Sequence, residues 1–122
     1  MNIQFLIAGI LTAITALVHS IAGEITTIRP LTNTELKQVP KLELRAAFYI
    51  VTVHLYASAI MLFILAFATN RDVVMGRFLA IQYFGYGIAF LGLAVTKQVG
   101  LFQVPQWIVL LLIAGLTYWG TV

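Results

Sequence analysis

Charged residues are scarce in this chain of 122 residues, and cysteine is absent altogether. Asp, Glu, Lys and Arg make up only 9% of the sequence, whereas a soluble domain averages about 25%. A soluble fold with so few charges could not cover its surface with polar groups. The absence of cysteine excludes disulfides, thiolate metal sites, cysteine nucleophiles and thiol redox chemistry.

Motifs that carry enzyme chemistry are also missing. The sequence has no serine nucleophile elbow, no glycine loop that would cradle a phosphate and no H-x-x-H, E-x-x-H or H-E-x-x-H spacing for a metal. It has no basic run with interleaved aromatic residues, so nucleic acid is not an expected partner. These absences favour a protein that is not an enzyme and that has no metal site.

What the chain does have is apolar length. Hydrophobic residues make up 61% of the sequence, and the mean hydropathy is +1.01. A helix needs about 20 apolar residues to cross a bilayer, and four runs come close to this length. They predict spans at residues 3–21, 46–68, 74–96 and 104–120, with Gly23 as the stop signal of the first.

The predicted fold class is therefore all-α, as a single polytopic membrane domain over residues 1–122. The second and third connections are short, which favours antiparallel neighbours and an up-down-up-down four-helix transmembrane bundle. The lipid bilayer is the expected solvent for most of the chain, and the inner (plasma) membrane of a bacterium is the expected location.

The first connection, residues 24–45, holds seven of the eleven Asp, Glu, Lys and Arg residues. Arg29-Pro30 and Val39-Pro40 punctuate it, because the residue before a proline is disfavoured in helical geometry. We expect an interfacial loop or a short interfacial helix in this segment.

Basic residues predict the orientation. The first and third connections carry Arg29, Lys37, Lys41, Arg45 and Lys97, whereas the side of the termini carries only Arg71 and Arg77. By the positive-inside rule, these two connections are expected in the cytoplasm and both termini outside.

Polar side chains gather in the half of the predicted bundle near the first connection. Ionisable groups in lipid are costly and usually face the bundle interior or mark a functional site. We expect either ion pairs between the flanking glutamates and arginines or a polar vestibule. The predicted set is His19, Glu24, Arg29, Glu43, Arg45, His54 and Gln106.

The two histidines allow a sharper hypothesis. His19 and His54 could ligate a haem b or a metal between the first two spans, since histidine is the usual ligand in bundle cores. The alternative is that each imidazole hydrogen-bonds to a neighbouring helix. No cofactor is predicted, and haem is kept as an alternative.

Two stripes of small residues predict close helix packing. One comprises Gly9, Ala13, Ala16 and Ser20 on the first span, and the other comprises Gly85, Ala89 and Gly92 on the third. Small residues let helices approach closely in lipid. We expect these stripes to pack within the bundle or against another protein.

The pattern H-x(3)-G-E at His19, then R-P-L at Arg29, Arg45 and His54, resembles a family of small uncharacterised bacterial integral membrane proteins. The entry Pro105-Gln106-Trp107 is similar too. The resemblance implies a small integral membrane protein and carries over no catalytic residue.

The predicted function is an accessory or interaction subunit of a membrane assembly, whose partner is a larger membrane protein or a second copy. One alternative is a minimal oligomeric transporter or channel with a vestibule of His19, Glu24, Glu43 and His54. The other alternative is the haem- or metal-binding redox protein.

Overall fold

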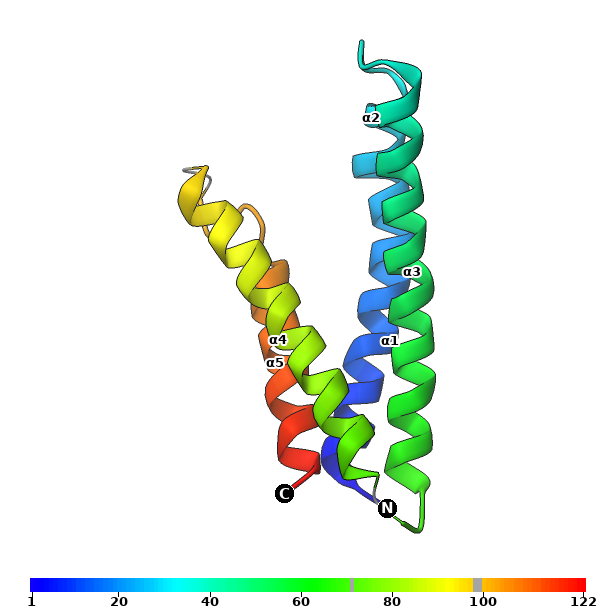
Figure 1. Ribbon diagram of the computed structural model, residues 1–122, viewed down its shortest axis with the longest axis vertical. Helices are drawn as coiled ribbons and strands as arrows, with labels where there is room; N and C mark the ends of the chain where they lie inside the picture. The colour runs from blue at the N-terminus through cyan, green and yellow to red at the C-terminus, as the bar shows by residue number, and fades with distance from the viewer. Residues whose placement is uncertain (71, 98–99) are drawn as a thin grey trace.

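The computed structural model describes residues 1–70, 72–97 and 100–122 (Figure 1). This part of the chain is all-helical and comprises four rods of alternating direction, with both termini at one end. The predictions that concern Arg71 and the turn at 98–99 lie outside the described residues. The elements are α1 (Ile3–Gly23), a π-helical turn η1 (Glu24–Ile28), α2 (Arg29–Thr32), α3 (Gln38–Phe67), α4 (Val73–Thr96) and α5 (Gln106–Gly120).

The predicted helix stop at Gly23 is wrong. Gly23 has helical angles (φ −65°, ψ −35°), and the helix continues as one apolar rod from Ile3 to Thr32. In a regular α-helix the Pro30 ring would clash with the Thr26 carbonyl and leave it without a donor. The preceding turn is instead π-helical, and the Arg29 N–H donates to the Glu24 carbonyl. This wider turn lets the helix pass through Pro30.

The expected loop at residues 24–45 is therefore mostly helix. Pro40 does not break the chain but occupies the first turn of α3, where a proline is tolerated because its missing N–H has no intrahelical acceptor. Only residues 33–37 connect the two helices, and Lys41 Nζ donates to the Thr32 carbonyl at 3.0 Å across this connection. The third and fourth predicted spans match α4 and α5 within two residues.

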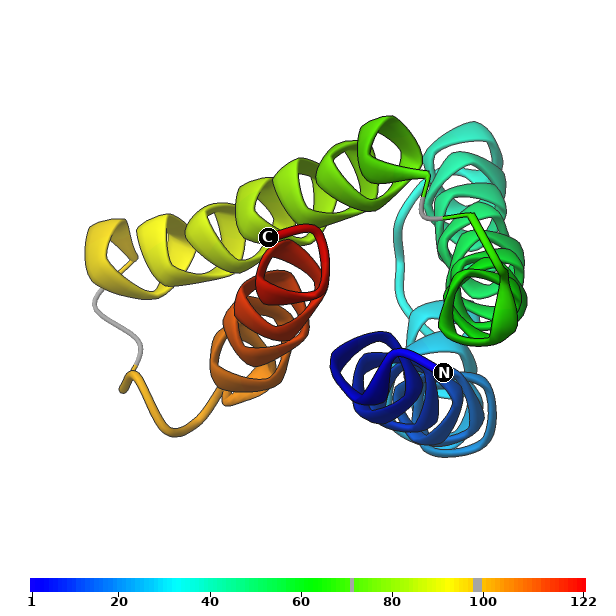
Figure 2. The same ribbon diagram turned by 90° about the horizontal axis from the view of Figure 1, so that it is seen from below.

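The helices form two antiparallel hairpins, α1–α3 and α4–α5, which meet at the end that holds the termini and diverge toward the other end (Figures 1 and 2). Helix α1 also packs against α5, whereas α3 and α4 barely touch. Two apolar clusters fill the closed half. One consists of Phe5, Ala8, Leu62, Leu65, Ala66 and Leu79, and the other of Ala16, Leu55, Tyr83, Leu110, Ile113 and Ala114.

Asn2 closes the joined end. Its side-chain oxygen accepts from the Phe5 N–H at 3.1 Å and caps α1, while its amide donates to the Gly120 carbonyl at 2.9 Å. Its own N–H donates to the Ala66 carbonyl at 2.7 Å. Asn2 thus fixes the ends of α1, α3 and α5 at one level. The Phe5 ring packs directly against Gly76. A Cβ at position 76 would lie only 2.9 Å from this ring, so the close contact requires glycine.

Helix lengths differ. The rods Ile3–Thr32 and Gln38–Phe67 have 30 residues each, α4 has 24 and α5 has 15. At about 1.5 Å per residue these are about 45, 36 and 22 Å, against about 30 Å for the hydrocarbon core of a bilayer. The first three are long and apolar enough to cross a membrane, and α5 is a shorter apolar helix.

Candidate binding cleft

A cleft of about 620 Å³ opens where the hairpins diverge, and all four long helices contribute to its walls. The walls are mostly aliphatic and aromatic side chains, among them Val51, Ala89, Phe90 and Val109. Small-molecule sites are typically apolar clefts of about 300–1,000 Å³ with a few convergent polar groups. The cleft has this size and composition, so it is the candidate functional site.

Each helix contributes one larger polar side chain to the cleft. These are His19 from α1, His54 from α3, Tyr86 from α4 and Gln106 from α5. We call them the polar collar. Three of its members belong to the set predicted from the sequence, and Tyr86 was not in that set. Tyr86 of α4 contacts His54 of α3. The periodicity of a single helix cannot show which neighbouring helix a side chain meets.

His54 is the best connected member of the collar. Its Nε2 lies 3.2 Å from Ser58 Oγ and 3.4 Å from the Tyr86 hydroxyl. The rings of Tyr86 and Tyr83 lie beside it, with centroids 5.5 and 6.1 Å away. Tyr83 has no exposed surface, and its hydroxyl lies beside Ser58 and Thr12 without forming a well-aligned hydrogen bond. Hydroxyl groups therefore extend below the collar into the core.

The remaining two members of the collar are His19 on α1 and Gln106 on α5. The His19 ring stacks on Phe48 with centroids 4.3 Å apart, and its Nε2 lies 3.4 Å from the Phe48 carbonyl oxygen. Gln106 is exposed at the start of α5, and its side-chain amide makes no hydrogen bond to the residues that the structure describes. The collar thus contains both satisfied and unsatisfied polar groups.

Helix geometry places the collar far from the closed end of the molecule. Along α3, His54 lies 12 residues before Ala66, or about 18 Å, and Gln106 lies 14 residues before Gly120, or about 21 Å along α5. His19 lies about 26 Å along α1 from Asn2. Asn2 bonds to both Ala66 and Gly120, so these three residues mark the same closed end. Tyr86 lies about 15 Å beyond Gly76, which itself packs beside Phe5.

The charged members of the predicted set lie elsewhere. None of the side chains of Glu24, Arg29, Glu43 and Arg45 lines the cleft. They lie on η1, α2 and the first turns of α3, on the side of His19 and His54 that leads to the α1–α3 turn. The ion pairs expected among them are not formed within the described ranges. Glu24 instead accepts a hydrogen bond from the Tyr49 hydroxyl at 3.4 Å.

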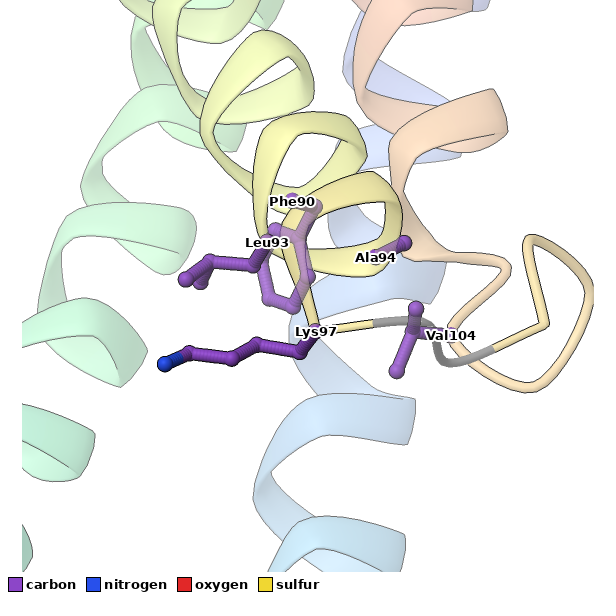
Figure 3. Close-up of a pocket in the computed structure, with 5 residues that line it drawn as sticks. All are labelled: Phe90, Leu93, Ala94, Lys97 and Val104. Carbon is purple, nitrogen blue, oxygen red and sulfur yellow. The ribbon is translucent and has the colours of Figure 1, made fainter.

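A smaller hollow of about 260 Å³ adjoins the cleft at the far end of α4 (Figure 3). It shares Phe90 and Leu93 with the cleft and is completed by Ala94, Lys97 and Val104. The Lys97 side chain extends away from Val104, so its ammonium group lies at the rim. This is typical of a lysine near a membrane boundary, where the stem covers apolar surface and the charge stays in water.

The two stripes of small residues differ in how they pack. Gly9 packs against α3, where an added Cβ would lie 3.3 Å from the Phe63 ring, and Ala16 is fully buried. The first stripe therefore packs inside the molecule, as predicted. On α4, Gly85 and Gly92 have no atom within 4 Å of an added Cβ. The glycine of α4 that packs on α5 is Gly87, which faces Leu111.

Among the described residues, no group of three or more His, Cys, Asp or Glu side chains could hold a metal ion. The chain matches no known family model, no curated protein and no solved structure. The arrangement of the cleft is therefore the basis for any functional conclusion.

Proposed function

We propose that this chain crosses a bilayer four times and acts as a binding protein, with the cleft between its hairpins as the binding site. Three rods long enough to span support the membrane assignment. In the turn before the short α5, the Gln103 N–H donates to the Gly100 carbonyl and Trp107 Nε1 donates to the Leu101 carbonyl. Irregular backbone at membrane depth needs such partners.

The observation that carries the binding role is the cleft itself. It has about 620 Å³ of space, five polar side chains (Thr15 and the four of the polar collar) and no catalytic constellation among its described lining residues. Bundles commonly bind ligands between facing helices. An occupant would enter sideways from the lipid, because the hairpins are already apart where α3 and α4 diverge.

The test is photo-crosslinking from inside the cleft. A benzophenone amino acid at Ala89 faces the cleft, and the same residue at Ile81, on the same helix and 71% exposed, is the matched control. After irradiation in native membranes, intact mass analysis should show one discrete adduct from position 89 and a broad series of lipid adducts from position 81. The same broad series from both positions would refute the proposed role.

The accessory-subunit hypothesis is the second candidate, and the exposed glycines of α4 favour it. Gly85 and Gly92 border the cleft residue Ala89 on one helix face, and an added Cβ at either glycine would have no atom within 4 Å. Open small residues allow another helix to approach closely in lipid. Gly85→Leu with Gly92→Leu should then reduce recovery of a partner or second copy after mild solubilisation, while an unchanged complex would argue against it.

The transporter and haem hypotheses receive less support from the geometry. The proposed vestibule is divided, since His19 and His54 line the cleft whereas Glu24 and Glu43 do not. His19 lies beside Phe48, about 9 Å along α3 from His54. Two imidazoles on one metal ion have nitrogens about 4 Å apart, twice the usual metal–nitrogen distance. Both Nε2 atoms here have separate protein neighbours.

We also propose a bacterial inner-membrane location with the α1–α3 turn in the cytoplasm, in line with the family that the sequence resembles. The α1–α3 turn and the end of α4 that carries Lys97 lie at the open end, opposite the termini (Figure 1). Segment 24–45 on either side of that turn carries Arg29, Lys37, Lys41 and Arg45, so with Lys97 there are five basic residues against Arg71 and Arg77, which favours this orientation.

A further inference from the structure

The cleft discriminates between charged and uncharged occupants. Among its described lining residues there is no Asp, Glu, Lys or Arg, so a charged ligand would find no counter-charge. Its polar side chains are two imidazoles, one phenol, one carboxamide and the Thr15 hydroxyl, which already donates to the Leu11 carbonyl at 2.7 Å. The nearest lysine, Lys97, belongs to the adjoining hollow and lies at its rim.

Depth strengthens this discrimination. The collar lies about 18–26 Å along the helices from the closed end; with that end at one boundary of a hydrocarbon core of about 30 Å, the collar lies about 4–12 Å inside the opposite boundary. A phosphate or ammonium headgroup drawn to this depth would lose its hydration without a compensating partner. Ordinary phospholipid headgroups stay at the interface, so only an uncharged polar group would reach the collar at low cost.

The collar has unused hydrogen-bonding capacity. The contact between the Tyr86 hydroxyl and His54 Nε2 is long, at 3.4 Å, and Tyr86 can donate and accept at the same time. The Gln106 amide has two donors and an acceptor, and none of them is bonded within the described part of the chain. Unpaired polar groups in an apolar cleft are costly, which favours an occupant that bears an oxygen atom.

We infer that the cleft binds a neutral, lipid-soluble molecule whose carbonyl or hydroxyl oxygen bonds to Tyr86, His54 or Gln106. This inference rests on the proposed function and specifies the chemical class of the occupant. The apolar body of the ligand packs on Ala89, Phe90 and their neighbours, and its far end extends into the lipid between α3 and α4. Quinones, sterols and long-chain alcohols share this chemistry, and a phospholipid held by its headgroup does not.

The test uses the protein in phospholipid vesicles with Trp119→Phe, which leaves Trp107, the neighbour of Gln106, as the only tryptophan. Binding of 2-decyl-1,4-benzoquinone is followed as saturable quenching of Trp107. Three competitors of equal chain length then displace it: 4-decylphenol, decylbenzene and 4-decylbenzoate. We expect 4-decylphenol to compete at least tenfold better than the other two, because only it is neutral and carries a hydroxyl.

Two substitutions separate the inference from the proposed function. Tyr86→Phe should weaken 4-decylphenol several-fold and leave decylbenzene unchanged, while Tyr118→Phe, at an exposed tyrosine of α5 outside the cleft, should change neither. Ala89→Phe should strongly reduce saturable quenching, because the added ring occupies part of the cleft and brings no second tryptophan into the assay.

The outcomes are distinct. If Ala89→Phe reduces quenching but the three competitors are equal, or Tyr86→Phe has no effect on 4-decylphenol, the cleft binds apolar molecules without recognising an oxygen. The inference then fails while the proposed function stands. Unchanged quenching in a folded Ala89→Phe protein would overturn both.

Discussion

Asn2→Ala removes two of the three hydrogen bonds that Asn2 makes at the closed end of the molecule, namely the cap of α1 and the bond to α5. The lost cap of α1 contributes about 1 kcal/mol. The lost bond from the Asn2 amide to the Gly120 carbonyl adds about 0.6–1 kcal/mol, the range for interhelical bonds in membranes and in proteins generally. The bond from the Asn2 N–H to Ala66 belongs to the backbone and remains. We expect a total loss of about 2 kcal/mol.

The free energy of unfolding is measured in mixed micelles by titration with a denaturing detergent, with helical circular dichroism as the signal. Asn2→Ser keeps a capping oxygen but cannot reach Gly120, so it should lose only about half as much. Asn33→Ala makes the same chemical change at an exposed position and should stay within about 0.5 kcal/mol of the parent. If Asn2→Ala matched Asn33→Ala, the closed end would not be held by Asn2.

Three further predictions follow from the fold. Gly76→Ala should destabilise the protein by about 1–3 kcal/mol in the same titration, because its Cβ would lie 2.6 Å from Thr121, whereas Gly92→Ala should not; equal effects would contradict this packing. Pro30→Ala should return the Glu24–Ile28 turn to α-helix, seen as a change in backbone NMR shifts there; unchanged shifts would mean that Pro30 is not the cause of the π turn. Alkaline phosphatase fused to the C-terminus should be active outside the cytoplasm, and an inactive fusion with an active cytoplasmic reporter would reverse the orientation.

The number and type of helices could be predicted from the sequence because long apolar runs have few alternatives. Without water to satisfy its backbone, such a segment must be helical. The helix ends were harder to predict. Gly23, Pro30 and Pro40 were each interpreted as breaks, yet all three lie in helices. A π turn before Pro30 and a first-turn position for Pro40 remove the steric conflicts that those interpretations assumed.

The candidate site was predicted in part. His19, His54 and Gln106 were singled out because they are polar residues within apolar runs, and the structure brings all three to one cleft. Glu24 and Glu43 were grouped with them from their positions in the sequence, but the long α1–α3 hairpin carries them beyond it. The two stripes of small residues looked alike in the sequence but pack differently. Gly9 packs against α3, whereas an added Cβ at Gly85 would have no atom within 4 Å.

The sequence by itself determined that the chain is helical and apolar, and that its charges concentrate around one turn, because composition and run length decide how a segment meets lipid or water. Only the tertiary structure decided that the hairpins part at one end and that the polar collar faces the resulting cleft. Helix periodicity gives the face on which a side chain lies, but not which neighbour that face meets. That choice depends on contacts between distant residues, such as those that Asn2 and Phe5 make with the end of α5.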